Sequence, residues 1–378
     1  MRIFTFDFVP YARNLKGSLG YPVGRQHFDP EIAAQTYHNH VEQFQVCEEV
    51  GFDGISLNEH HGSPYGLDNS PNVFLSYIAR ATSHIKLTML GNLLPLHAHP
   101  LRVAEELAML DCITRGRLIA GFVRGIPREH LVYSVPLNES AARFDEALDV
   151  ILNAWTSESF THHGRFFDYD SVDMWPRPYQ QPRPPVWVAA ISQDSSRKIA
   201  HREGCSLAVN FLPTAAVKLQ LAAFREEADK IGRKVTDDDI IYGRHVFVGE
   251  TQAEAEALCR EHVAYYFNNL LEEINTAALH KLKEQNPDID FEKVKPPFDY
   301  ATANMDNLRE RGLLIVGTPD RVFQDLMEQY EEVGGFGTLL AMIRMGTMPQ
   351  DVVLRCMRLV GAELIPKMHA VHDPAPVS

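Results

Sequence analysis

The sequence predicts an α/β fold in which eight parallel strands and their helices close into a (β/α)8 TIM barrel with insertions. Short apolar strand patterns alternate with helical patterns eight times along the chain. The strands are nearly continuous apolar runs, as expected where both faces of a sheet are covered. The sequence holds no dinucleotide-type glycine fingerprint and no Walker A motif, so a closed barrel is favoured over an open sheet. Such barrels commonly exceed the usual domain length, and we expect one domain over residues 1–378.

The strand predictions rest on apolar runs bounded by polar or glycine-rich segments. The first segment alternates and carries aromatics, the second is a short apolar run after Gly51, and the third is almost wholly apolar. The same pattern returns along the rest of the chain. We expect strands at residues 2–9, 54–58, 85–94, 117–123, 186–190, 206–210, 240–248 and 338–343.

The helix predictions rest on start and stop signals around periodic segments. Proline suits a first helical turn, so Pro30, Pro100 and Pro319 each open a helix. Asp29 and Asn138 are expected caps, and Gly232 ends a helix. We expect helices at about 30–50, 72–82, 100–113, 138–155, 195–203, 214–231, 251–268, 318–333 and 351–365.

Two excursions interrupt the alternation, at about 157–185 and 269–312. The first is rich in proline and aromatic residues, and a hairpin is one option for it. The second is charged, holds Pro287, Pro296 and Pro297, and is too long for a plain loop in a compact domain. We expect some helix in it and regard it as a candidate lid over the barrel mouth.

Composition excludes several classes of function. The formal net charge is −14, which disfavours nucleic acid and anionic membranes as partners. No apolar run reaches the length of a transmembrane helix, and the first residues are expected to form a strand rather than a signal peptide. The five cysteines include no CxxC pair, so neither a disulfide framework nor a cysteine zinc site is indicated. A reduced cytoplasmic compartment fits these features.

The segment Asn58-Glu59-His60-His61 follows a predicted barrel strand directly. Chemistry in such barrels is placed at the carboxyl ends of the strands, and an imidazole can exchange protons near neutral pH. Each histidine could instead be a hydrogen-bonded structural side chain. We weigh these two interpretations evenly for Glu59 and His61, and favour a catalytic role for His60.

An anion site is the second hypothesis. Arg124 ends the fourth strand, and Arg143 lies near the start of the following helix, so both could hold a phosphate. Ser192 and Ser195 stand where a strand leads into a helix N-terminus, a position that suits a phosphate as well. The alternatives are a salt bridge at the rim for the arginines and ordinary helix capping for the serines.

A metal site is a third hypothesis. His97 and His99 have HxH spacing and could join His60 and His61 at one mouth. No carboxylate stands at a persuasive spacing beside them, so this hypothesis is the weaker one.

Several motifs, in this order, resemble the bacterial luciferase-like flavin-dependent monooxygenases. The resemblance covers nearly the whole chain apart from 269–312, and the ordered set is more specific than any single motif. The matching segments are Gly51-Phe52-Asp53, Asn58-Glu59-His60-His61, Leu94-Pro95-Leu96, His99-Pro100, Gly121-Phe122-Val123-Arg124-Gly125, Pro185-Val186-Trp187-Val188-Ala189-Ala190 and Gly317-Thr318-Pro319.

The resemblance implies a two-component monooxygenase. Such an enzyme binds reduced FMN (FMNH2) supplied by a separate flavin reductase, and a C4a-peroxyflavin formed with O2 oxygenates a small organic substrate. It also implies a homodimer. Carried over by position, His60 assists the flavin chemistry, and the other matched positions bind the cofactor: Gly91, Asn92, Arg124, Arg143, Ala189, Ala190, Ser192 and Ser195.

Two details refine this expectation. Members of the family often have a non-prolyl cis peptide under the flavin, and Gly91-Asn92 falls at that place. The light-emitting members have a reactive cysteine where this chain has Val123, so the chain looks more like the non-luminous members.

Three other functions stay open. A deazaflavin (F420) oxidoreductase of the same superfamily would transfer hydride without oxygen. A metal-dependent barrel hydrolase would use His60, His61, His97 and His99. A non-catalytic barrel subunit is the third, and His60 with the two arginines argues against it.

Overall fold

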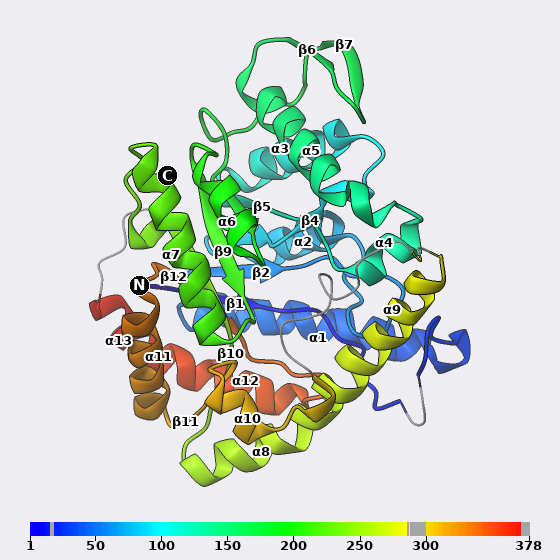
Figure 1. Ribbon diagram of the computed structural model, residues 1–378. Coiled ribbons are helices and arrows are strands. Elements are labelled where there is room, and N and C mark those ends of the chain that lie inside the picture. The colour runs from blue at the N-terminus through cyan, green and yellow to red at the C-terminus, as the bar shows by residue number, and fades with distance from the viewer. Residues whose placement is uncertain (16–18, 286, 288–299, 372–378) are drawn as a thin grey trace.

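The computed structural model, which describes residues 1–15, 19–285, 287 and 300–371, confirms the barrel (Figure 1). Eight parallel strands of these residues form a closed ring, because the last pairs with the first. In ring order they are β1 (Arg2–Phe6), β2 (Gly54–Leu57), β3 (Lys86–Met89), β5 (Leu118–Val123), β8 (Val186–Ala189), β9 (Cys205–Asn210), β10 (Ile240–Val248) and β12 (Thr338–Met342). These are the eight predicted strands. The assignment of residues 1–378 to a single domain stays a prediction.

Helices surround this ring, and most begin where the sequence signals place them. Asp29 caps the first by accepting a hydrogen bond from the Glu31 amide, and Thr318 caps another in the same manner. Asn138 is not a cap, because a 3-10 turn over residues 137–139 precedes the helix there. The outer helices are α1 (Pro30–Glu49), α2 (Pro71–Ala81), α3 (Pro100–Thr114), α5 (Ser140–Thr156), α6 (Gln193–Ala200), α7 (Thr214–Lys230), α8 (Gln252–Ala264), α11 (Pro319–Val333), α12 (Gln350–Leu359) and α13 (Ile365–Val371).

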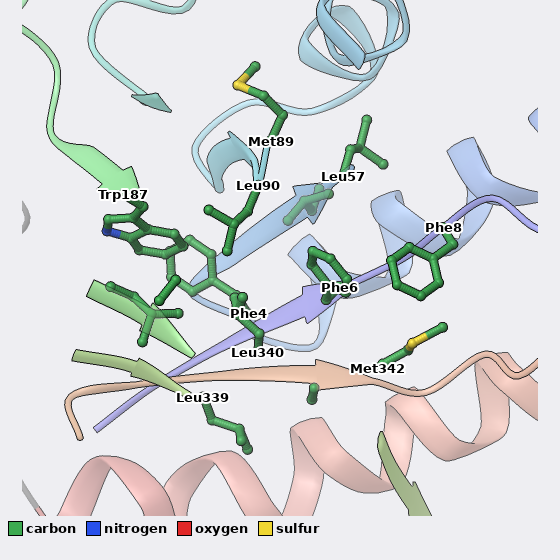
Figure 2. Close-up of a cluster of buried hydrophobic side chains, with 14 of the residues drawn as sticks. Phe4, Phe6, Phe8, Leu57, Met89, Leu90, Trp187, Leu339, Leu340 and Met342 are labelled. Atoms are coloured by element: carbon green, nitrogen blue, oxygen red, sulfur yellow. The ribbon is translucent and has the colours of Figure 1, made fainter. Parts of the chain in front are cut away.

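Large apolar side chains fill the barrel interior (Figure 2). Phe4 of β1 meets Trp187 of β8 with 5.1 Å between ring centroids, and Phe6 and Phe8 continue this aromatic packing toward the mouth. The interior is therefore a packed core and not a pore. Space for a ligand is left at the carboxyl ends of the strands.

The predicted strand 85–94 is interrupted. β3 ends at Met89, the Leu90–Gly91 peptide is cis, and β4 (Asn92–Leu93) then pairs with β5. The non-prolyl cis bond thus lies one residue before the predicted Gly91–Asn92 position. A Cβ on Gly91 would come within 2.4 Å of the Gly121 carbonyl oxygen, so this close approach of backbones requires glycine. Apolar periodicity carries no information about such a break.

The first excursion contains the hairpin, formed by the antiparallel strands β6 (Phe160–His163) and β7 (Asp168–Val172). The second contains helix, as expected, but the helical run that starts with α8 does not stop at the predicted residue 268. It continues through a π-helix (Tyr265–Glu273) into α9 (Ile274–Gln285). Residues 286 and 288–299 of the predicted lid lie outside the described residues.

Some short elements were not predicted individually, although some helix was expected within 269–312. They are α4 (Pro127–Tyr133), the 3-10 turn Tyr300–Thr302, α10 (Met305–Glu310) and β11 (Leu314–Gly317), which pairs with the outer half of β10. α9 packs on α4 beside the barrel mouth (Figure 1). Among the helices of the described residues, none is long and apolar enough to cross a membrane.

Candidate active site

A cavity of about 440 Å³ opens at the carboxyl ends of β1, β2, β5, β8 and β9. Most of its wall is apolar, with polar side chains gathered at two places. Seven of the nine residues predicted for the site line this one cavity: His60, Gly91, Arg124, Ala189, Ala190, Ser192 and Ser195. Asn92 and Arg143 do not line it.

His60 occupies the aromatic side of the cavity. Its ring lies 5.2 Å from that of Phe8 and 4.8 Å from that of Tyr65, centroid to centroid. Its Nδ1 lies 2.7 Å from Oε1 of Glu129, a residue of α4 that is fully buried. An ionised carboxylate can only accept a hydrogen bond, so Nδ1 carries the proton and Nε2 keeps its lone pair.

Electrostatics support this assignment of the proton. Burial alone would raise the pKa of Glu129, but the Arg128 guanidinium and the neighbouring imidazoles of His60 and His61 lower it to about 2. Burial lowers the pKa of His60, and Glu129 opposes that shift only in part. Near neutral pH the imidazole is therefore neutral, and Nε2 can accept a proton.

His61 and Glu59 form a separate pair. His61 Nε2 lies 2.9 Å from Glu59 Oε1, and Glu59 Oε2 accepts the backbone N–H of Leu93 at 2.8 Å. Burial would raise the pKa of Glu59, but the hydrogen bond from His61 and the nearby His97 imidazole lower it to about 2. Glu59 lines the cavity and His61 does not, and the contacts of Glu59 join the end of β2 to β4.

Cationic side chains gather at the opposite side of the cavity. The Arg124 side chain makes no hydrogen bond or ion pair with the described residues, and partial burial lowers its pKa. Lys198 Nζ lies 2.7 Å from Asp145 Oδ2, and Arg202 Nη2 lies 3.6 Å from Asp145 Oδ1. All four of these residues line the cavity. Such a cluster suits an anionic ligand group.

The two serines cap helix α6 at this cationic side. Ser192 Oγ accepts the Ser195 amide N–H at 3.2 Å, and Ser195 Oγ accepts the Ser192 amide N–H at the same distance. This reciprocal capping is the ordinary structural interpretation. It also brings both hydroxyls and the positive end of the α6 dipole to the cavity wall.

The two predicted residues that miss the cavity have other contacts. Arg143 Nε donates to Glu139 Oε2 at 2.9 Å, and its guanidinium lies over the Phe166 ring at 4.5 Å from the centroid. The alternative of a rim salt bridge therefore describes Arg143 better than a phosphate contact. Asn92 is buried in β4, where it pairs with β5.

Sequence reasoning missed Glu129, Arg128, Lys198 and Arg202. The last two could have been found, because residues 195, 198 and 202 are spaced three and four apart and share one face of the helix predicted at 195–203. Glu129 lies 69 positions from His60 in the sequence, and no local pattern links them.

The metal hypothesis finds little support in the geometry. His60 and His61 pair with different carboxylates, and His97 Nε2 lies 3.9 Å from Glu59. Within the described ranges no three His, Cys, Asp or Glu side chains gather as a metal site would require.

Sequence comparison identifies the family to which this chain is similar. The family model of the luciferase-like monooxygenases matches residues 19–336. An uncharacterised protein, y4wF of Sinorhizobium fredii, is 29% identical over 343 residues, covering 90% of this chain and 94% of that protein. The oxygenase component of a flavin-dependent trigonelline monooxygenase from Acinetobacter baylyi is 28% identical over 63% of this chain and 66% of its own length.

Solved structures share the fold. Monooxygenase RslO1 from Streptomyces bottropensis superposes with a TM-score of 0.77 at 27% identity, covering 97% of this chain and 99% of that one. The oxygenating constituent of 3,6-diketocamphane monooxygenase from Pseudomonas putida, in complex with FMN, gives 0.77 at 21% identity over 97% and 98%. An F420-dependent secondary alcohol dehydrogenase gives 0.68 at 16% identity over 97% and 98%, so the fold alone does not choose the cofactor. From its sequence match and its barrel, the chain belongs to the luciferase-like monooxygenase family.

Proposed function

We propose that this protein is the oxygenase component of a two-component, flavin-dependent monooxygenase that uses reduced FMN and O2 to oxygenate a small organic substrate. One observation carries the proposal: a single, largely apolar cavity has a cationic cluster at one side and a neutral imidazole at the other. A molecule with an anionic tail and a large apolar ring system fits this division.

The donor set fits FMN. Arg124, Lys198 and the hydroxyls of Ser192 and Ser195 would hold the phosphate, because they combine charge with directed hydrogen bonds. The apolar wall beside Phe6, Phe8, Leu90, Val123 and Phe144 would take the ring system. When bound, reduced flavin supplies the electrons that activate O2, which side chains cannot do themselves.

The chain has three tasks in this proposal. The cationic side anchors the cofactor, the apolar wall excludes water, and His60 Nε2 accepts or returns a proton. The Asp145 carboxylate, which now contacts Lys198 and Arg202, must yield part of that contact when a phosphate arrives. No side chain needs unusual reactivity for these tasks.

The first experiment is a binding titration. FMN, riboflavin and F420 are titrated into the protein, in oxidised form and then reduced without oxygen. We expect reduced FMN to bind more tightly than reduced riboflavin, since riboflavin lacks the phosphate. Preference for F420 over reduced FMN would favour the hydride-transferring alternative instead.

The second experiment tests oxygenation. The protein is coupled to a flavin reductase under ¹⁸O2 with a panel of candidate substrates, and products are analysed by mass spectrometry. The names of the relatives suggest N-methylated heteroaromatic acids, cyclic ketones and terpenes as the panel. A product heavier by one ¹⁸O atom supports the proposal. Hydrogen peroxide as the sole oxygen product across the panel, with no FMN binding, would contradict it.

We also propose a homodimer in addition to the reductase partner. Large apolar side chains are exposed on neighbouring helices: Val73 and Tyr77 on α2, and Met109 and Ile113 on α3. Two copies could bury this face against each other. Sedimentation of the wild type and of Tyr77→Glu would test this, with a dimer expected only for the wild type.

A further inference from the structure

A continuous chain of polar contacts links helix α9 to the cavity imidazole. Asn275 of α9 accepts a hydrogen bond at Oδ1 from Arg128 Nη1, at 3.1 Å. Arg128 Nη2 donates to Glu129 Oε1, also at 3.1 Å, and the same oxygen accepts from His60 Nδ1 at 2.7 Å. Of these four residues, only His60 lines the cavity.

Burying these charged side chains costs free energy. The side chains of Glu129 and Arg128 are 0% and 1% exposed. A buried ion pair can often be replaced by apolar side chains without loss of stability, so stability is a weak reason for its presence. A fixed orientation and a fixed charge beside the imidazole are stronger reasons.

The carboxylate of Glu129 is shared among three donors. Oε1 accepts from both His60 and Arg128, and Oε2 accepts the backbone N–H of His61 at 3.0 Å. A glutamine here would fail in either orientation. With its oxygen toward His60, its NH2 meets the His61 N–H; when flipped, its NH2 meets Arg128 and forces His60 into the other tautomer.

We propose that Glu129, Arg128 and Asn275 are positioning residues that fix His60 as the Nδ1–H tautomer and set the pH range in which Nε2 accepts a proton. Docking of α9 on α4 is thereby coupled to the state of the imidazole (Figure 1). The use made of that proton rests on the proposed function, but the arrangement itself does not.

The groups around His60 determine in which direction its pKa should change in each variant. Burial is the largest effect on its pKa and lowers it, Glu129 raises it, and Arg128 and His61 lower it. Tyr65 also packs against the ring, and burial raises the pKa of this phenol, so it stays neutral. Removing Glu129 should therefore lower the pKa of His60, and removing Arg128 should raise it.

The test is NMR of the full chain with ¹⁵N-labelled histidine and no flavin. The His60 signals are identified by their loss in His60→Gln, and long-range proton–nitrogen correlations report the tautomer. We expect Nδ1–H in the wild type. Over a pH series, Arg128→Met should raise the pKa of His60 and Glu129→Gln should lower it. Asn275→Ala should also raise the pKa of His60, by a smaller amount than Arg128→Met.

The control is Arg102→Met, which removes an arginine from an exposed pair with Glu106 and should leave His60 unchanged. Circular dichroism checks that each variant folds. If Arg128→Met does not fold, Asn275→Ala takes its place, because it keeps the buried charge and removes only the side-chain oxygen that accepts from Arg128. An Nε2–H tautomer in the wild type, or shifts of the same sign in the Glu129 and Arg128 variants, would overturn the proposal.

The flavin titration separates this inference from the proposed function. A protein that binds no flavin but shows the expected tautomer and opposite shifts would refute the function and keep the inference. A protein that binds FMN, but whose His60 signals do not change in Glu129→Gln, would support the function and refute the inference.

Discussion

The two sides of the cavity differ in how their charges are held. On the cationic side, Lys198 and Asp145 are partly exposed, and the Arg124 side chain makes no hydrogen bond or close ion pair within the described part of the chain. On the imidazole side, Glu129 and Arg128 are buried and paired. Partly solvated charges can rearrange around an incoming ligand at low cost, whereas buried pairs hold one geometry. The first arrangement suits binding and the second suits orienting a group for proton transfer.

The largest effect should come from the imidazole side. His60→Ala should lower turnover by about 10²–10⁴-fold, the usual contribution of a positioned proton-transfer group, and leave FMN affinity nearly unchanged. Initial rates in the reductase-coupled assay measure this, with a substrate found by the screen. The matched variant His61→Gln, whose side chain does not line the cavity, should lose much less. Equal losses in both variants would remove the distinction between the two histidines.

The next largest effect should be on stability at acid pH, through the buried Glu59 carboxylate. The pKa of Glu59 is about 2 in the folded protein against its ordinary 4.5. Stability from this lowered pKa is therefore complete above pH 4.5 and is lost as pH falls toward 2. Its size is on the order of 3 kcal/mol. Urea unfolding from pH 7 to 3 should show a shallower decline for Glu59→Gln than for the wild type, and parallel curves would contradict this.

On the cationic side, Arg124→Ala should weaken FMN binding by about 10–100-fold, since a charge-assisted hydrogen bond contributes about 1.5–3 kcal/mol. Riboflavin binding should hardly change, because no phosphate is present. Arg143→Ala, whose guanidinium contacts Glu139 and Phe166 outside the cavity, should have little effect on either. Loss of FMN affinity in Arg143→Ala but not in Arg124→Ala would place the phosphate elsewhere.

The smallest effect should come from the helix cap. Ser195→Ala removes one neutral hydroxyl from the cavity wall and one partner of the reciprocal cap. We expect FMN affinity to fall by only a few-fold, consistent with about 1 kcal/mol for a neutral hydrogen bond. Titration beside the wild type measures this. A loss as large as that of Arg124→Ala would mean that the hydroxyl, and not the guanidinium, dominates phosphate binding.

The sequence by itself determined the eight strands, most helices and the residues that follow each strand. These features are local, because apolar periodicity and cap residues act within a few positions. Parallel strands then deliver their ends to one mouth, so His60, Arg124 and Ser192 could be grouped in advance.

Only the tertiary structure decided which neighbours those residues have. In the folded protein His60 contacts Glu129, and both Lys198 and Arg202 contact Asp145. The Arg143 guanidinium lies over the Phe166 ring. The tertiary structure also continued the helical run that starts with α8 past residue 268, through a π-helix into α9, and no sequence signal predicted this. The physical reason is that side-chain pairing and burial depend on segments tens of positions apart, whose packing leaves no periodic trace in the chain.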